Sequence, residues 1–297
     1  FTDGVLYLDF WTKEIDQYVG DYFDVVEQIK KRIAIEERKN AQLKKSIQDR
    51  KDKVNFFANK GGKMRKLAKK LKDEVADAED SIVRVKADDK TITPFTIDAV
   101  KFTESHANLS SIGIWVNGEV IHKDVDIDLR RGGRLLIKGP NGIGKTTLLE
   151  RLANRTEEVA IIPPEINVGY YRQDFSGLDF SQTAYNSLKD VIEVDDPELI
   201  FGIAARFLLK GSVLQNPIGM LSEGQKALLT FARFVLQKPS LLILDEPTNH
   251  VNFRHLPVIA EALSKFEGAM IVVSHDEEFV KKIQFTEVVD LGRLKDR

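Results

Sequence analysis

The sequence predicts an α/β fold in which helices cover a mostly parallel sheet, with a basic helical hairpin in front of it. From about residue 94 onward, short apolar segments alternate with helix-like segments, which is the pattern of parallel strands connected by helices. Residues 21–86 instead show apolar side chains at helical spacing. With 42% hydrophobic and 30% charged residues among 297, the chain has an ordinary soluble composition and enough material for a core.

The elements of the α/β part follow from their apolar patterns. Four short apolar segments are expected to be strands: residues 134–138, 159–162, 241–244 and 270–273. Two longer stretches are expected to be helices: residues 145–154 and 223–237.

Two helical arms are expected before this domain. Seven apolar residues, spaced three and four apart, predict that residues 63–86 form one helix of a coiled coil: Met64, Leu67, Leu71, Val75, Ala78, Ile82 and Val85. Five more predict a helix across residues 21–56: Ile29, Ile33, Leu43, Ile47 and Val54. Gly61 and Gly62 interrupt the pattern, which predicts an antiparallel hairpin with its tip at residues 56–62.

Positive charge is concentrated in the half of the hairpin nearest its tip. Residues 38–72 contain 14 basic and 2 acidic side chains, whereas the whole chain has a net charge of −2. Because so few opposite charges are interspersed, this segment is a candidate contact for a polyanion such as nucleic acid. A solvated pair of charged helices without a partner is the alternative.

The composition also excludes several kinds of site. The chain has no cysteine, which rules out disulfides, thiolate metal sites and cysteine nucleophiles and agrees with a reducing, cytoplasmic compartment. No apolar run approaches the ~18–20 residues that cross a bilayer, and no signal peptide is recognisable, so no membrane partner is expected. Since the chain opens with Phe1 rather than Met, we expect a processed or shortened form.

A glycine-rich loop follows the strand expected at residues 134–138. Residues 139–146 read Gly-Pro-Asn-Gly-Ile-Gly-Lys-Thr, the G-x-x-x-x-G-K-[ST] pattern of a phosphate-binding loop. Its glycines let backbone N–H groups turn inward around a phosphate, and the following helix directs its positive end at the same anion. Lys145 would place a charge on the β- and γ-phosphates, and Thr146 would offer its hydroxyl to Mg²⁺.

Two carboxylates end the strand expected at residues 241–244. Asp245 can hold a water molecule of Mg²⁺, and Glu246 can polarise the attacking water as a general base. An apolar strand that ends in two acids is weak evidence by itself. Together with the phosphate-binding loop it predicts hydrolysis of a nucleotide.

Further motifs resemble those of the ATP-binding cassette (ABC) ATPases. Residues 221–225 read Leu-Ser-Glu-Gly-Gln, which is similar to the LSGGQ signature and precedes the strand of Asp245 as in that family. Gln173 falls at the position of the family's Q-loop glutamine, and His275 at that of its switch histidine. The resemblance covers roughly residues 100–292 and implies an ABC-type P-loop NTPase domain with a parallel sheet core, an antiparallel β subdomain and a helical subdomain.

One segment narrows the resemblance. Residues 246–250, Glu-Pro-Thr-Asn-His, are similar to the EPTNH segment of the ABC-F subfamily, whose members carry two cassettes joined by a basic helical hairpin and act at the ribosome. By this resemblance residues 21–93 are the linker, 94–297 the second cassette and 1–20 the end of a first cassette. The implied partners are ribosomal and transfer RNA, contacted through residues 38–72, and a second cassette in cis or in a head-to-tail dimer.

The resemblance also assigns the site residues. Those implied to bind ATP are Trp115, Asn141, Gly142, Gly144, Lys145, Thr146, Thr147, Ser222, Gly224 and Gln225. Those implied to hold Mg²⁺ are Thr146, Gln173 and Asp245, and those implied to act in catalysis are Gln173, Glu246 and His275. In the family the signature serine and glycines serve the nucleotide of the partner cassette, and closure of the two cassettes excludes water and aligns the attacking molecule.

Trp115 and two departures from the family pattern leave alternatives open. Trp115 is the aromatic residue best placed to stack on adenine, but the family residue aligns nearer Val116, and a core tryptophan is the alternative. Asn252 stands where the family's D-loop has aspartate, which puts the coupling between the two sites in question. Glu223 adds a negative side chain near the γ-phosphate bound in trans, where it either weakens binding or points away.

Three alternative functions share part of these motifs. An ATPase subunit of an ABC transporter would share the other motifs after residue 100, but neither the EPTNH segment nor the basic hairpin. A chromosome-maintenance or repair ATPase would insert a coiled coil between Lys145 and Ser222, which are only 77 residues apart. A third variant binds ATP as a switch with negligible turnover. The sequence favours an ABC-F-type ATPase that acts on the ribosome in regulation, rescue or antibiotic resistance.

Overall fold

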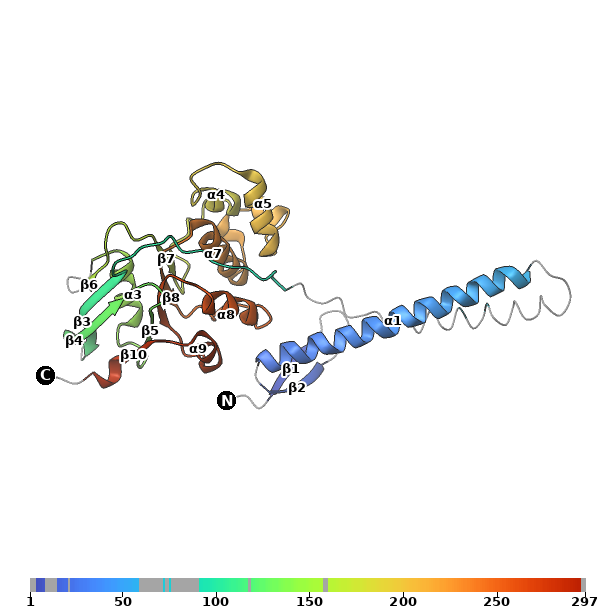
Figure 1. Ribbon diagram of the computed structural model, residues 1–297, viewed down its shortest axis with the longest axis horizontal. Coiled ribbons are helices and arrows are strands. Elements are labelled where there is room, and N and C mark those ends of the chain that lie inside the picture. The colour runs from blue at the N-terminus through green and yellow to red at the C-terminus, as the bar shows by residue number, and fades with distance from the viewer. Residues whose placement is uncertain are drawn as a thin grey trace. The chain divides into compact units, whose positions relative to one another are not determined.

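The computed structural model divides the chain into two units, Phe1–Lys90 and Thr91–Arg297 (Figure 1). The described residues are 4–8, 15–20, 22–58, 72, 75, 91–116, 119–156 and 160–294. The division falls three residues before the boundary expected from the sequence. Ile92 is buried and the backbone N–H of Thr93 donates to the carbonyl of Arg206 at 3.0 Å, so both residues pack with the second unit.

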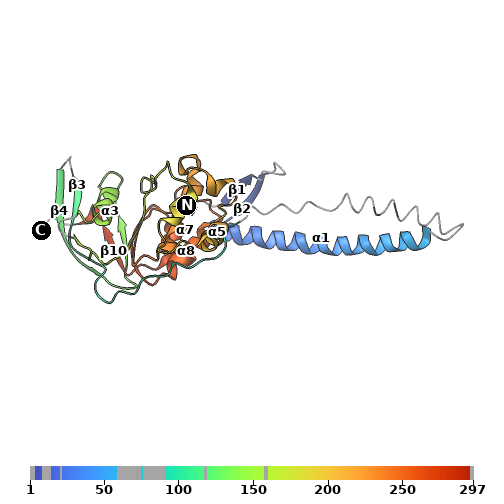
Figure 2. The same cartoon turned by 90° about the horizontal axis from the view of Figure 1, so that it is seen from above.

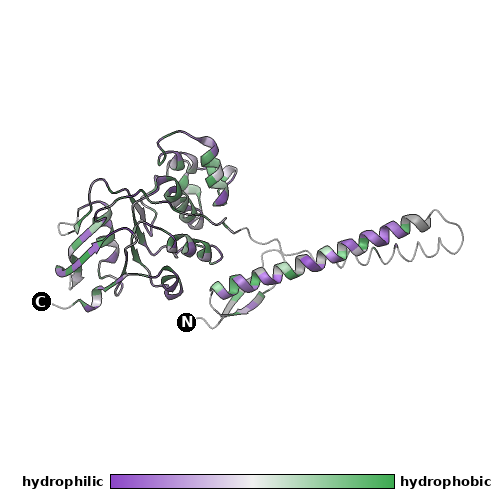
Figure 3. Cartoon of the chain, in the orientation of Figure 1, coloured by the Kyte–Doolittle hydropathy of each residue, from purple (hydrophilic) through white to green (hydrophobic). Residues whose placement is uncertain are grey.

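In the first unit, the described residues form a two-stranded sheet and one long helix. Strands β1 (Gly4–Leu8) and β2 (Ile15–Val19) pair antiparallel, and helix α1 (Tyr22–Ala58) follows. The helix is the first arm expected from the sequence, and Figure 3 shows hydrophilic bands recurring along it. The second arm, expected at residues 63–86, lies outside the described residues except for Lys72 and Val75, which are helical. The part of the expected tip at residues 59–62 also lies outside the described residues.

A five-stranded parallel sheet forms the core of the second unit, as the sequence predicted. Its strand order is β10-β5-β9-β8-β7, and every neighbouring pair is parallel. The strands are β5 (Arg134–Lys138), β7 (Val168–Tyr171), β8 (Leu241–Asp245), β9 (Ala269–Val273) and β10 (Glu287–Asp290). All residues of β8 and β9 are buried, which explains their uninterrupted apolar sequences.

A second, antiparallel sheet lies beside the first. It has the order β4-β3-β6 and is built from β3 (Ala107–Val116), β4 (Glu119–Leu129) and β6 (Ala160–Ile161). The apolar pattern of residues 159–162 suggested a strand of the parallel sheet. That expectation is wrong, because Ala160 pairs antiparallel with Leu109 of β3. A short apolar segment specifies a strand but not the sheet to which the strand belongs, and Ile161 at this edge is 69% exposed.

Helices cover the sheets and form a separate helical part. They are α3 (Lys145–Ala153), α4 (Ala184–Lys189), α5 (Pro197–Arg206), α6 (Ser212–Gln215), α7 (Glu223–Gln237), α8 (Leu256–Ser264) and α9 (Glu277–Ile283), with 3-10 turns η1 (Ile218–Met220) and η2 (Leu291–Arg293). Both views place α3 between the β3–β4 pair and the parallel sheet (Figures 1 and 2). Its buried face, Leu148, Leu149 and Leu152, belongs to one apolar core with residues of both sheets. None of the helices within the described ranges has the length and apolar content needed to cross a bilayer.

Candidate functional site: a pocket at the carboxyl edge of the sheet

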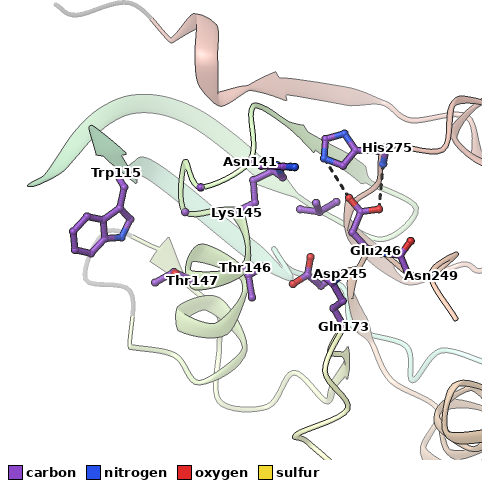
Figure 4. Close-up of a pocket in the computed structure, with 13 residues that line it drawn as sticks. Trp115, Asn141, Lys145, Thr146, Thr147, Gln173, Asp245, Glu246, Asn249 and His275 are labelled. Carbon is purple, nitrogen blue, oxygen red and sulfur yellow. Dashed lines mark hydrogen bonds and ion pairs between the residues drawn. The ribbon is translucent and has the colours of Figure 1, made fainter. Parts of the chain in front are cut away.

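A pocket of about 610 Å³ lies where the parallel strands end. Because β5, β7, β8 and β9 are parallel, the loops that follow them meet at the same edge of the sheet. The residues that line the pocket are Trp115, Asn141, Gly142, Gly144, Lys145, Thr146, Thr147, Gln173, Asp245, Glu246, Asn249, Val273 and His275. Figure 4 shows the ring of Trp115 at one end, Glu246 and His275 at the other, and Lys145 between them.

The phosphate-binding loop connects β5 to α3. Gly144 is the N-cap of α3 and has φ 98°, a left-handed conformation that glycine adopts without strain. The ammonium of Lys145 donates to the carbonyls of Gly139 (2.8 Å) and Pro140 (3.1 Å), which holds it over the loop. The free N–H groups at the start of α3 and this ammonium together suit an anion such as a phosphate.

Trp115 packs against this loop. Its backbone N–H donates to the carbonyl of Ile143 at 3.0 Å, and a Cβ atom at Gly144 would lie only 2.8 Å from its Cδ1. The residue is 43% exposed, so it is not a core tryptophan. The side chain of Val116 lies outside what the structure describes. The position and exposure of Trp115 suit stacking on a planar ring held next to the phosphates.

Replacing Trp115 with alanine is expected to weaken ATP binding about fivefold to thirtyfold, because stacking on a base contributes about 1–2 kcal/mol. The affinity for inorganic tripolyphosphate, which has no ring to stack, should not change. Calorimetric titration of both ligands would measure this, with Ile161→Ala as an exposed control. An equal loss of both ligands would show that Trp115 supports the loop instead of stacking.

Asp245 ends β8 inside the pocket and is 1% exposed. Burial raises the pKa of Asp245, while a hydrogen bond with Thr146 and the charge of Lys145 act in the opposite direction. Within the described part of the chain, its Oδ2 atom is buried without a hydrogen-bond partner. An unsatisfied carboxylate oxygen beside a threonine hydroxyl is a suitable ligand position for a hard cation or its water.

Glu246 follows in a strained backbone conformation. Its φ is 47°, which is unfavourable for a residue with a side chain, and its N–H donates to the carbonyl of Val273 at 2.9 Å. The backbone N–H of His275 donates to its Oε2 at 3.2 Å, and the His275 Nε2 atom lies 3.5 Å from Oε1 (Figure 4). Burial raises the pKa of Glu246, and the N–H and charge of His275 lower it in part. A carboxylate with a raised pKa, held by its neighbours at the pocket wall, suits a general base.

The pocket fits Mg²⁺ held jointly by protein and phosphate oxygens. No group of three His, Cys, Asp or Glu side chains among the described residues is arranged to hold a metal ion by itself. Mg²⁺ typically binds through one or two carboxylates plus substrate phosphates, so such a group is not needed. Asp245 and the hydroxyl of Thr146 supply the protein oxygens on one side of the pocket, and Gln173 adds an amide oxygen.

The structure brings most of the residues suggested by the sequence into this pocket. Three of them do not line it: Ser222, Gly224 and Gln225. They begin α7, where the Ser222 hydroxyl accepts from the Gln225 N–H at 3.2 Å and the Gln225 side chain accepts from the Ser222 N–H at 3.0 Å. This capping box satisfies two backbone N–H groups at the start of the helix.

Two lining residues were not identified from the sequence. Asn249 lies in the Glu-Pro-Thr-Asn-His segment, three residues after Glu246, so its position in that motif was the available signal. Val273 is the last residue of β9, and nothing in its residue type distinguishes it from the other buried valines.

Comparison with known proteins agrees with this geometry. The family model described as ABC transporter matches residues 122–249. ABC transporter F family member 5 of Arabidopsis thaliana is 33% identical over 199 residues, which are 65% of this chain and 29% of that protein. ATP-binding cassette sub-family F member 2 of Mus musculus is 27% identical over 288 residues, 93% of this chain and 44% of that protein. The chain thus spans less than half the length of either relative.

The fold agrees with a solved cassette as well. A dimeric ATP-binding cassette in a post-hydrolysis state, bound to ADP and Pi, superposes with a TM-score of 0.51 at 19% identity, covering 64% of this chain and 97% of that one. At this identity the likeness shows the fold alone. The F-family relatives, in contrast, match in sequence over much of the chain, including the region before the cassette. The chain therefore carries the ATP-binding domain of the ABC family, and its homologues are members of the ABC-F group.

Proposed function

We propose that this chain binds ATP with Mg²⁺ and hydrolyses it when a second cassette completes the site. The observation that carries the proposal is the meeting of the phosphate-binding loop with two buried carboxylates, Asp245 and Glu246. Among the described residues, Oδ2 of Asp245 has no hydrogen-bond partner, and Oε1 of Glu246 has no hydrogen bond but lies 3.5 Å from Nε2 of His275. Buried carboxylate oxygens without partners are unfavourable unless a ligand satisfies them.

Each pocket residue then has a distinct task. Lys145 and the N–H groups at the start of α3 bind the phosphates, and Trp115 orients the base. Glu246 takes a proton from the attacking water, while His275 keeps the carboxylate aimed at that water. Mg²⁺ supplies charge neutralisation at the β- and γ-phosphates, with Thr146, Gln173 and Asp245 as the residues that would hold it.

A second cassette is part of the proposal because the signature lies outside the chain's own pocket. Ser222 and Gly224 begin α7, whose first N–H groups and positive end suit the phosphates of a nucleotide held by another cassette. The solved cassette of the same fold is dimeric and bound to ADP and Pi, which agrees with a site completed by a second cassette. The partner would be supplied in cis in a longer protein or by head-to-tail dimerisation.

We further propose that the protein acts on the ribosome in the cytoplasm, with the hairpin against RNA. The C-terminal half of α1 exposes basic side chains along its length: Arg38, Lys39, Lys45, Lys51 and Lys53. Such a row suits phosphates, whose contacts dominate the affinity of proteins for nucleic acid. The F-family relatives support a shared role for the hairpin region, since one of them matches over 93% of the chain.

Co-sedimentation with purified bacterial and eukaryotic ribosomes tests the ribosomal proposal. The Glu246→Gln chain, which should hold ATP without hydrolysing it, is expected to pellet with ribosomes in ATP but not in ADP. The same chain joined to a first cassette serves as the completed form. If neither form pellets with either kind of ribosome, the ribosomal role is wrong.

Three lysines of α1 provide a second test of the RNA contact. Replacing Lys39, Lys45 and Lys53 with glutamine should make ribosome binding less sensitive to salt. The magnitude of the slope of log affinity against log salt concentration should fall by about 2 to 3, because each lost phosphate contact removes roughly 0.7–0.9 from that magnitude. The matched control replaces three exposed lysines of the second unit with glutamine: Lys101, Lys210 and Lys265. An unchanged slope in the α1 variant would make the hairpin a spacer.

A further inference from the structure

Glu223, the residue at which the signature departs from its family, contacts the segment that carries the catalytic carboxylate. It is the first residue of α7, and its Oε2 atom lies 2.7 Å from Nδ1 of His250. His250 ends the five-residue segment that begins at Glu246. Both ends of this segment have left-handed backbone conformations, with φ 47° at Glu246 and 65° at His250.

The backbone of His250 also lies close to the start of helix α7. A Cβ atom at Gly224 would lie 3.2 Å from the carbonyl oxygen of His250, so the first turn of α7 packs closely against this residue. Gly224 thus allows the close approach, and the carboxylate of Glu223 contacts the ring of His250 beside it. Glu223 therefore contacts the side chain of His250, and Gly224 lies against its main chain.

A third contact joins His250 to the segment of Gln173. The rings of His250 and Phe175 lie 5.9 Å apart between centroids, with an angle of 58° between their planes. Phe175 is buried and follows Gln173 by two residues. His250 therefore lies where the signature helix, the Gln173 segment and the segment of Glu246 meet.

The segment of Glu246 depends on such contacts to keep its shape. Inside the segment, the N–H of Asn249 donates to the carbonyl of Glu246 at 3.0 Å. Left-handed conformations at residues with side chains persist only where the surroundings determine them. At the His250 end, the surroundings are Glu223, Gly224 and Phe175.

We propose that Glu223 is a positioning residue, which acts through His250 to hold the segment that presents the carboxylate of Glu246. The inference rests on the proposed function for the role of Glu246 as a base, but the contact between Glu223 and His250 is present without ATP. It also gives the unusual signature residue a task. The carboxylate of Glu223 makes its contact within its own cassette. Through His250 it connects two parts of the chain: helix α7, which would bind a nucleotide held by a partner cassette, and Glu246, the proposed general base for the nucleotide in the chain's own pocket.

Hydrogen exchange at two backbone amides, measured by NMR on the full chain, reports on this arrangement. The Asn249 amide reports on the segment, and the His275 amide, which donates to the carboxylate of Glu246, reports on that side chain. Glu223→Gln and His250→Gln should each speed exchange at both amides about threefold to fivefold, as expected for loss of one partly exposed polar side-chain contact.

The double variant and a matched control separate positioning from general destabilisation. If Glu223 acts through His250, the double variant should exchange no faster than the faster single variant. Glu198→Gln makes the same charge change in the first turn of α5, at an exposed position, and should leave both amides unchanged. Unchanged exchange in Glu223→Gln, or effects that add in the double variant, would overturn the proposal.

The same spectra distinguish this inference from the proposed function. Addition of ATP and Mg²⁺ should slow exchange across residues 139–147 if the pocket binds nucleotide. Absence of that protection would contradict the proposed function, while the exchange at Asn249 and His275 without nucleotide would still decide the role of Glu223.

Discussion

Replacing Glu246 with glutamine is expected to lower ATP turnover by about 10² to 10⁴-fold, the usual contribution of a general base. The amide oxygen can still accept from the N–H of His275, so the pocket keeps its shape, but the amide cannot take a proton from water. ATP affinity should therefore stay within about twofold of the original. Phosphate release and calorimetric titration would measure the two quantities, on the chain alone and with a second cassette added.

The dependence of ATP turnover on pH provides a control for the assigned role of Glu246. Because burial raises the pKa of Glu246, its protonated form accumulates at higher pH than for an ordinary glutamate, and turnover should fall as the pH is lowered through that raised pKa. The small residual turnover of Glu246→Gln should lack this fall. Glu261→Gln, an exposed change on α8, should behave like the original chain. Normal turnover in Glu246→Gln would show that another group accepts the proton.

Replacing Lys145 with alanine is expected to weaken the binding of ATP by about 10 to 100-fold, since a charge-assisted hydrogen bond to an anion contributes roughly 1.5–3 kcal/mol. The ammonium lies over the phosphate-binding loop, so the loss should extend to tripolyphosphate as well. This distinguishes Lys145 from Trp115, whose removal should affect ATP alone.

Lys138→Ala is the matched control for this change. Lys138 is exposed and ends β5 just before the loop, and it does not line the pocket that contains Lys145. The same charge is lost close to the site, so a general electrostatic effect would appear in both variants. Equal losses in the two variants would argue that Lys145 contributes only its charge at a distance. An unchanged affinity in Lys145→Ala would contradict the assignment of the pocket.

Local patterns predicted the parts of the site that depend on neighbouring residues in the chain. The phosphate-binding loop is defined by its glycines and Lys145, and the strand before it was expected with the bounds that β5 has. Asp245 and Glu246 follow an uninterrupted apolar strand, which fixes their place at the edge of a parallel sheet. The first arm of the hairpin was equally readable, because apolar spacing alone specifies a helix.

Features that depend on contacts between distant segments could not be predicted in this way. The pairing of β6 with β3 joins residues about fifty positions apart, and the apolar pattern of β6 fits either sheet. The exposure of Trp115 follows from where β3 meets the loop of Gly144, which the sequence does not encode locally. The partner of Glu223 is His250, 27 residues later, and an acidic residue in a signature carries no sign of it.

The residues that line the pocket come from segments as far apart in the sequence as Trp115 and His275. This wide spacing affects how long the protein would persist in the cell. A nucleotide that touches all of these segments would add its binding free energy to the unfolding free energy of the second unit, by about 4 kcal/mol at a thousandfold excess over the dissociation constant. The helix α1 lies in the other unit and contributes no residue to the pocket lining. ATP depletion would thus lower the melting temperature of the cassette and expose it to proteases, so that the abundance of the intact protein follows the energy state of its host.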